Sequence, residues 1–138
     1  MPKLSAWLVR SSLIYMGLGF LFGGMILYHK GIPLFAWTWK LLTPHIEIMI
    51  YGWTMQFVMG MAFWILPRFT GTNRYGRVQL GWWSFALLNS GLLLVVLDAW
   101  WFAQWPTIVA RLLMLAAVVA FVVMMWPRVK PLSEYSTN

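Results

Sequence analysis

The sequence predicts an all-α integral membrane protein, built as a bundle of four transmembrane helices. Of its 138 residues, 62% are hydrophobic and only 9% are charged, whereas soluble domains carry about 25% charged residues. The apolar residues form four runs of roughly 20 residues, each long enough to cross a hydrocarbon core of about 30 Å as a helix. No run shows the alternation of a β-strand, and lipid cannot satisfy free backbone groups. The length predicts one membrane domain over residues 1–138.

Turn-forming residues set the limits of the four predicted helices. The first is followed by Gly31 and Pro33. Thr43 and Pro44 suit the start of the second, as an N-cap and a first-turn proline, and Pro106 opens the fourth. The predicted helices cover approximately residues 6–28, 44–66, 78–101 and 107–126.

The basic residues predict the orientation of the chain. One side of the predicted membrane carries only Lys30 and Lys40. The other side carries seven basic residues, which are Lys3, Arg10, Arg68, Arg74, Arg77, Arg128 and Lys130. The positive-inside rule then places both termini in the cytoplasm of a multi-pass protein of the inner (plasma) membrane. The net charge of +7 is explained by topology and by attraction to anionic membrane lipids, and no basic face for nucleic acid is present.

Small residues in the first predicted helix indicate close helix packing. Gly19 and Gly23 form a GxxxG pair, a spacing that lets membrane helices approach each other closely. We expect this pair to serve packing within the bundle rather than a dedicated dimer face.

His45 stands at the start of the second apolar run, and three roles are open to it. It could bond water at the interface, bond Glu47 or a loop carbonyl, or bind a metal, since neutral imidazole is the commonest protein ligand. At helical spacing His45 shares one stripe with Met49, Gly52, Gln56 and Gly60. This small and mildly polar stripe suits either the bundle interior or a flat cofactor.

The few charges within the apolar runs require partners, because charges in membranes are usually paired or line a pathway. Asp98 and Arg111 have opposite signs and similar predicted depths. We therefore expect an Asp98–Arg111 pair, with Arg111 bound to a cofactor carboxylate as the alternative. Glu47 is expected to pair with Lys40 or Lys30, or to accept a bond from nearby backbone.

The stretch "HIEIMIYGWTMQFVMGMAFWILPRFTG" resembles the second transmembrane helix of heme-copper oxidase subunit I, whose family includes nitric oxide reductases and quinol oxidases. The matching residues are His45, Met49, Gly52, Trp53, Met59, Gly60, Leu66, Pro67 and Arg68. The next stretch, "GWWSFALLNSGLLL", resembles the third helix of that family at Asn89 and Gly91. The resemblance covers the chain from about Thr43 to Leu94.

This resemblance implies a heme site. In the family, the histidine of this helix is an axial ligand of the low-spin heme on the outer side of the membrane. It therefore implies that His45 binds the iron of a heme b, with Met49, Gly52 and Arg111 as further cofactor-binding residues. The predicted topology independently places His45 on the outer side.

The chain also departs from the family pattern. Family members have about twelve helices in three similar groups of four, whereas this sequence has four helices and two histidines. A binuclear oxygen-reducing centre would need more histidines, so terminal oxidase activity by this chain alone is not expected. The second axial ligand is left open among His29, a methionine such as Met49 or Met25, and His45 of another copy. Fold analogy suggests a homo-oligomer, for example a trimer, or association with other respiratory-complex subunits.

Two classes of function follow from these features. The first is a small b-type membrane cytochrome that binds heme through His45 for electron transfer in or near a respiratory complex. The second is a cofactor-free structural or assembly subunit with an oxidase-like fold. His45 on a small-residue stripe favours the cytochrome, and the lack of an obvious second axial histidine favours the structural subunit. We expect the cytochrome.

Overall fold

A computed structural model of the chain describes residues 1–33, 35–69, 74–98 and 104–129. Within these ranges the chain has four helical segments long and apolar enough to cross a membrane. The predicted four-helix fold is confirmed, and the chain is a multi-pass membrane protein.

The helical segments follow one another with short connections. The first crossing is α1 (Lys3–Gly31). The second crossing is composite and contains the 3-10 helix η1 (Ala36–Leu41), α2 (Leu42–Glu47), the π-helix η2 (Ile48–Met55) and α3 (Gln56–Ile65). The third and fourth crossings are α4 (Val78–Asp98) and α5 (Gln104–Met125), and the 3-10 helix η3 (Trp126–Arg128) follows α5.

The second crossing begins earlier than predicted, at Ala36 instead of near residue 44. Pro44 does not start this crossing because η1 already leads into α2. Proline is tolerated in the first turn of an α-helix, where its missing N–H needs no partner, and Pro44 is the third residue of α2. The predicted end of the third helix at residue 101 lies outside the described residues.

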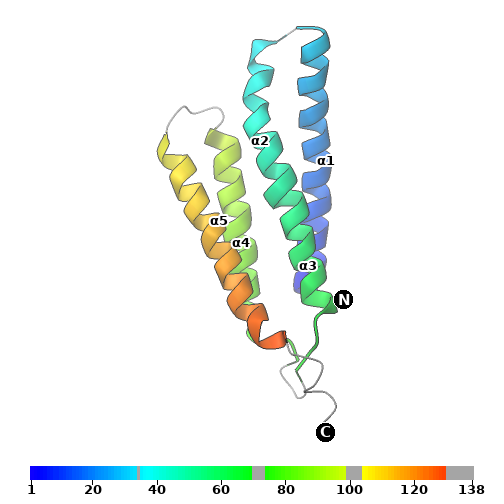
Figure 1. Cartoon of the computed structure of the whole chain (residues 1–138), viewed down its shortest axis with the longest axis vertical. Coiled ribbons are helices and arrows are strands. Elements are labelled where there is room, and N and C mark those ends of the chain that lie inside the picture. The colour runs from blue at the N-terminus through cyan, green and yellow to red at the C-terminus, as the bar shows by residue number, and fades with distance from the viewer. Residues whose placement is uncertain (34, 70–73, 99–103, 130–138) are drawn as a thin grey trace.

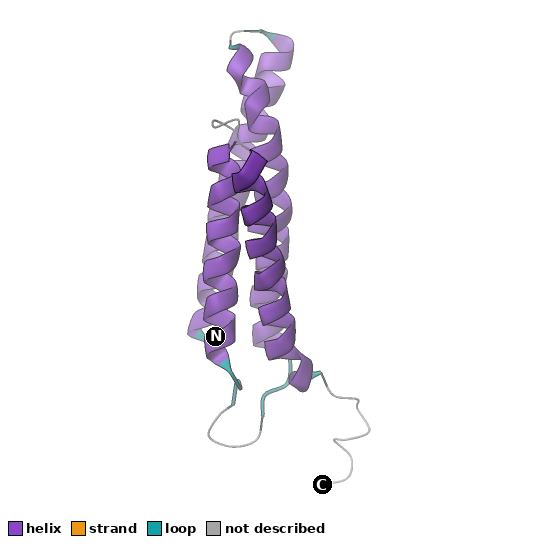
Figure 2. Cartoon of the chain, turned by 90° about the vertical axis from the view of Figure 1, so that its left-hand side faces the viewer, coloured by secondary structure: helices purple, strands orange, loops and turns teal. Residues whose placement is uncertain are grey.

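The four crossings pair into two helical hairpins. Figure 1 shows α1 beside the composite second crossing, and α4 beside α5. The N-terminal end of α1 and the end of α5 lie at the same end of the bundle, and Figure 2 shows the same elongated arrangement from the side. The first hairpin extends further than the second at the opposite end (Figure 1).

The interior of the bundle is aliphatic and closely packed. Leu8, Phe63, Leu88 and Leu92 have no exposed surface. Gly52 allows the two hairpins to approach, since a Cβ atom there would lie 2.8 Å from both Leu92 Cδ2 and Tyr15 Cγ. In lipid such packing, rather than removal of apolar surface from water, drives helix association.

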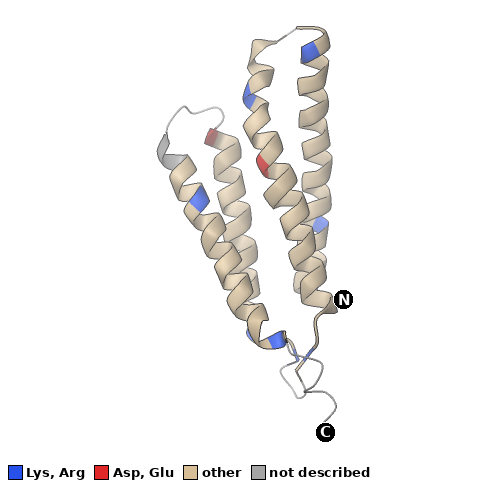
Figure 3. Cartoon of the chain, viewed as in Figure 1, with Lys and Arg blue, Asp and Glu red and all other residues tan. Residues whose placement is uncertain are grey.

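Within the part of the chain that the structure describes, polar contacts join the two hairpins at three positions along the bundle. Toward the end where the first hairpin extends further, Arg111 of α5 binds Glu47 of α2. In the middle, the Tyr15 hydroxyl donates to Asn89 Oδ1 at 2.7 Å. At the other end, the buried Arg128 donates to three carbonyl oxygens, those of Phe63 (3.0 Å), Leu66 (2.7 Å) and Pro67 (2.9 Å). Figure 3 shows long stretches of ribbon without Lys, Arg, Asp or Glu along the crossings.

Candidate functional site

His45 lies in α2, one residue beyond the buried Pro44, and its ring packs against α1. The Nδ1 atom lies 2.8 Å from the carbonyl oxygen of Gly19. Gly23, one turn further along α1, leaves room for the ring, because a Cβ atom there would lie 2.8 Å from His45 Cε1. The GxxxG pair of α1 therefore forms the notch that receives the imidazole.

The hydrogen bond to Gly19 determines which ring nitrogen of His45 is available for chemistry. A carbonyl oxygen can only accept, so Nδ1 carries a proton and donates it. In the neutral ring the lone pair is then on Nε2. Histidines that bind metals usually donate their other N–H to a carbonyl or carboxylate in this way, which orients the ring and raises its basicity. The local chemistry of His45 thus suits ligation through Nε2.

Glu47 lies two residues after His45 and forms an ion pair with Arg111. Arg111 donates from Nη1 to Glu47 Oε2 at 2.7 Å and from Nη2 to Oε1 at 2.5 Å. The Glu47 side chain is only 8% exposed and that of Arg111 is 45% exposed. This two-pronged pairing is the geometry that makes arginine–carboxylate contacts strong, and it links α2 to α5 beside the His45 notch.

The predicted Asp98–Arg111 pair is wrong. The Asp98 carboxylate accepts a hydrogen bond from the Thr107 hydroxyl, and Arg111 binds Glu47 instead. Thr107 lies one turn closer to the start of α5 than Arg111 does, about 6 Å along the helix axis. Arg111 is thus the partner that the structure describes for Glu47, and the expected pairing of Glu47 with Lys40, Lys30 or nearby backbone stays a prediction. Asp98 Oδ1 is buried without a partner among the described residues.

Met49 and Gly52 continue the His45 stripe along the second crossing. The Met49 side chain packs at Gly19, where a Cβ atom would overlap its sulfur. Gly52 faces Tyr15 and Leu92, as described above. Both residues therefore lie in the helix packing of the bundle, and their roles toward a cofactor stay predictions.

The π-helix η2 begins one residue after Glu47. Its widened turn includes a hydrogen bond from the Thr54 hydroxyl to the Met49 carbonyl oxygen, at 2.9 Å. Isolated π-helical turns inside α-helices occur frequently at functional sites. The sequence carries no simple signal for such a turn, and the resemblance to the oxidase family did not indicate one.

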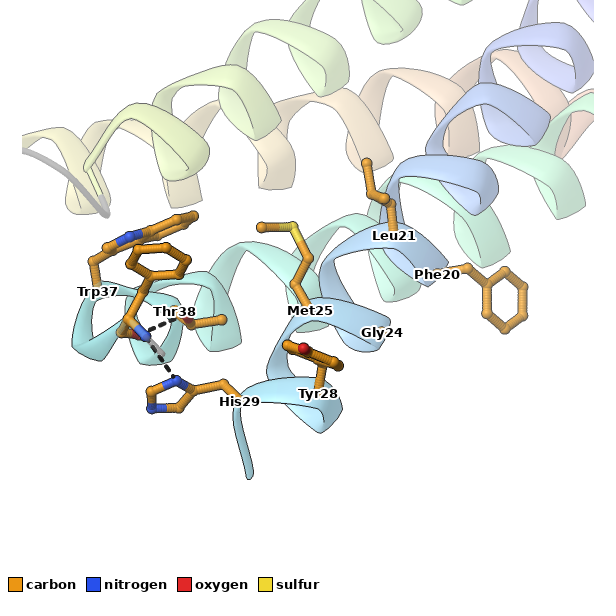
Figure 4. Close-up of a pocket in the computed structure, with 9 residues that line it drawn as sticks. Phe20, Leu21, Gly24, Met25, Tyr28, His29, Trp37 and Thr38 are labelled. Atoms are coloured by element: carbon orange, nitrogen blue, oxygen red, sulfur yellow. Dashed lines mark hydrogen bonds between the residues drawn. The ribbon is translucent and has the colours of Figure 1, made fainter. Parts of the chain in front are cut away.

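His29 occupies a different place from His45. It lies six residues beyond Gly23 on α1, which is about 9 Å along the helix axis. Its Nδ1 accepts a long hydrogen bond of 3.4 Å from the backbone N–H of Phe35, and its ring lies edge-on to Trp39. Figure 4 shows Met25 extending toward Trp37. His29 and Met25 lie in the last two turns of α1 and line a pocket there with Trp37 and Thr38.

The chain was compared with family models, curated proteins and solved structures. No family model, curated protein or solved structure matches the chain. The resemblance to heme-copper oxidase subunit I therefore stays a prediction from the residues of the second and third crossings. Among the described residues, no group of three or more His, Cys, Asp or Glu side chains could hold a metal ion.

The chemistry of His45 fits an axial ligand of a heme, and the source of a second axial ligand is open. An imidazole with its Nδ1 proton on a backbone carbonyl, in apolar surroundings, is a suitable axial ligand. The described residues bring no second imidazole to this place, whereas the Met49 thioether packs at Gly19 beside the His45 ring. A ligand role for His45, and the identity of a second axial ligand, stay predictions.

Proposed function

We propose that this protein is a small b-type membrane cytochrome, which carries electrons in or near a respiratory complex. The single observation that supports this function is the His45 notch. There the Gly19 carbonyl holds Nδ1 at 2.8 Å and leaves the Nε2 lone pair for an iron. The sequence resemblance of the second crossing to heme-copper oxidase subunit I points to the same histidine.

Each residue of the notch has a defined task in this proposal. Gly19 orients the imidazole and raises its basicity through the accepted hydrogen bond. Gly23 provides the space for the ring. Bound heme b would supply reversible one-electron chemistry at its iron. Arg111 neutralises Glu47 next to the notch and, being partly exposed, can also compensate a carboxylate of the cofactor.

The second axial ligand comes from another chain in this proposal. A homo-oligomer, for example a trimer, would bring the His45 side chains of several copies together, and another respiratory-complex subunit is the alternative source. The partly exposed Arg111 supports association, since a cation facing lipid is costly.

The proposed location is the inner (plasma) membrane with both termini in the cytoplasm. The basic residues support it, since seven lie on the side of the termini and two on the other. His45 would then lie toward the outer face of the membrane.

The test compares visible absorption spectra of purified wild-type protein and two substitutions of His45. His45→Asn keeps an amide N–H that can reach the Gly19 carbonyl, whereas His45→Ala removes both the hydrogen bond and the ligand. We expect a b-type Soret band with split reduced bands in the wild type, and loss of these bands in both variants. His29→Ala is the matched control and should keep the spectrum. A His45→Asn protein with an unchanged spectrum would refute ligation by His45.

The same observation supports a second candidate, a cofactor-free structural or assembly subunit. A hydrogen bond between helices is a structural contact in its own right, with an average contribution of about 0.6 kcal/mol in membranes. In that case wild-type protein is colourless and His45→Asn is as stable as wild type. Only His45→Ala then lowers the melting temperature.

A further inference from the structure

The outer part of the first hairpin contains a pocket that the proposed cytochrome function does not use. It has a volume of about 430 Å³ and lies between α1 and the η1 region, within the range of about 300–1,000 Å³ typical of small-molecule sites. Its α1 wall includes Leu21, Gly24, Met25 and His29. Figure 4 shows Trp37 and Thr38 facing this wall from the other side, and Phe35 also lines the pocket.

The position of the pocket along α1 matches the boundary between lipid tails and headgroups. α1 has 29 residues, a length of about 43 Å at 1.5 Å per residue, and so exceeds a hydrocarbon core of about 30 Å. Its last turn, with Tyr28, His29 and Lys30, therefore reaches the headgroup layer when the rest of α1 is in the hydrocarbon. The lower wall, near Leu21, stays at the depth of acyl chains.

The chemistry of the pocket also changes from one end to the other. The lower wall is apolar, and Phe20 and Leu21 are 63% and 57% exposed, so that this end is open to lipid. At the upper end the Phe35 N–H donates to His29 Nδ1. The neutral His29 ring therefore carries its proton on Nε2 and offers a donor there. Lys30 follows directly, and none of the three acidic residues of the chain lies among the pocket-lining residues.

From these features we infer that the pocket binds one anionic phospholipid. An acyl chain occupies the apolar space along Leu21, Gly24 and Met25, and the negative headgroup lies beside His29 and Lys30. Because η1 covers α1 here, the acyl chain of the lipid is held between two protein walls instead of lying on one helix surface. The His29 donor, the adjacent Lys30 and the lack of acidic side chains among the pocket-lining residues favour an anionic headgroup over a zwitterionic one.

Two glycines of α1 give a matched pair of variants for the test. Gly24 lines the pocket and Gly17 does not, and neither would bring a new Cβ within 4 Å of another atom. Gly24→Leu therefore fills the pocket from within, and Gly17→Leu adds the same side chain to an open surface of the same helix. Lys30→Gln changes the headgroup end alone and leaves the apolar space intact.

The experiment is native mass spectrometry of wild-type and variant protein released from vesicles of phosphatidylcholine and phosphatidylglycerol in equal parts. We expect one retained phosphatidylglycerol per wild-type chain, the same for Gly17→Leu, and at least about a tenfold loss for Gly24→Leu, which corresponds to about 1.4 kcal/mol. Lys30→Gln should retain both lipids equally. Equal retention by Gly24→Leu and wild type would overturn the pocket assignment. Equal retention of both lipids by wild type, or displacement by added ubiquinone, would overturn the choice of an anionic phospholipid.

The result does not depend on heme. The lipid count is read from mass, and colourless protein can be used. If Gly24→Leu does not yield folded protein, Gly24→Ala gives a smaller filling of the same space and should retain an intermediate amount of phosphatidylglycerol. No change with this variant, together with no change for Lys30→Gln, would also overturn the assignment.

Discussion

At the scale of single residues, the imidazole of His45 and the carboxylate of Glu47 share one turn of α2 and contact different helices. His45 points to α1 and bonds the Gly19 carbonyl, whereas Glu47 reaches α5 and binds Arg111. This turn of α2 is thus joined to α1 through His45 and to α5 through Glu47. The position of the ring depends on this pair of contacts.

The first prediction concerns Glu47. Glu47→Gln removes the charge that faces Arg111, and we expect the free energy of unfolding to fall by about 2 kcal/mol. Breaking a fully buried pair costs about 3–5 kcal/mol, and the exposed half of Arg111 reduces that figure. Thermal unfolding in detergent measures the effect.

Asp98→Asn is the control for this prediction. Its effect should be smaller, because Asp98 bonds the neutral Thr107. Exchanging the charges, with Glu47→Arg and Arg111→Glu together, should recover part of the stability lost by either change alone. An Asp98→Asn variant that is less stable than Glu47→Gln would contradict the assigned pair.

At the scale of the elements, the end of α3 shows how a helix terminus is satisfied inside an apolar bundle. The last carbonyl groups of a helix have no partner within it. Arg128, only 2% exposed, provides donors for the carbonyls of Phe63, Leu66 and Pro67. Its guanidinium also lies 5.0 Å from the centre of the Phe63 ring. α5 and η3 therefore close the end of α3 through one side chain.

The second prediction tests this cap. Arg128→Lys keeps the charge but cannot reach three carbonyls in the planar arrangement of a guanidinium, so we expect the free energy of unfolding to fall by about 3 kcal/mol. Arg68→Lys is the control, because Arg68 is exposed and contacts the Tyr75 ring at 5.3 Å. Chemical denaturation followed by circular dichroism compares the two. Equal losses would show that Arg128 acts only as a surface charge.

Particular residues show how far the sequence predicts this molecule. The number of crossings follows from apolar run length, and the stripe from His45 to Gly60 correctly identifies the face turned to the bundle interior. The link between Gly19 and His45 could not be predicted, although both residues were singled out, because a backbone carbonyl has no sequence signal. The Arg111 partner was missed because Asp98 lies level with Thr107, one turn from Arg111, and because the sequence does not show that Arg111 reaches α2 of the other hairpin.

At the scale of the whole molecule, two hairpins are joined by contacts at three positions and carry large apolar surfaces outward. Examples are Ile14 of α1 and Leu112 of α5, which are 65% and 60% exposed. In a membrane these surfaces face lipid or other helices. The start of α1 and the end of α5 lie at the same end of the bundle (Figure 1). The two therefore face the same side of a membrane.

The third prediction assigns that side. The chain contains no cysteine, so single substitutions give a clean label. In intact cells a membrane-impermeant maleimide should react with Lys30→Cys, and with Lys3→Cys only after permeabilisation, because the basic residues place the termini inside. The reverse pattern would invert the orientation and would move His45 to the cytoplasmic half.

The central claim is that His45 binds heme, and the visible spectrum of wild-type protein purified after expression with ample heme tests it most directly. The proposal predicts a low-spin b-type spectrum, with a Soret band and split bands on reduction. Wild-type protein that is colourless as purified, and that stays colourless when heme is added in detergent, would contradict the proposal and leave His45 as a structural histidine between α1 and α2.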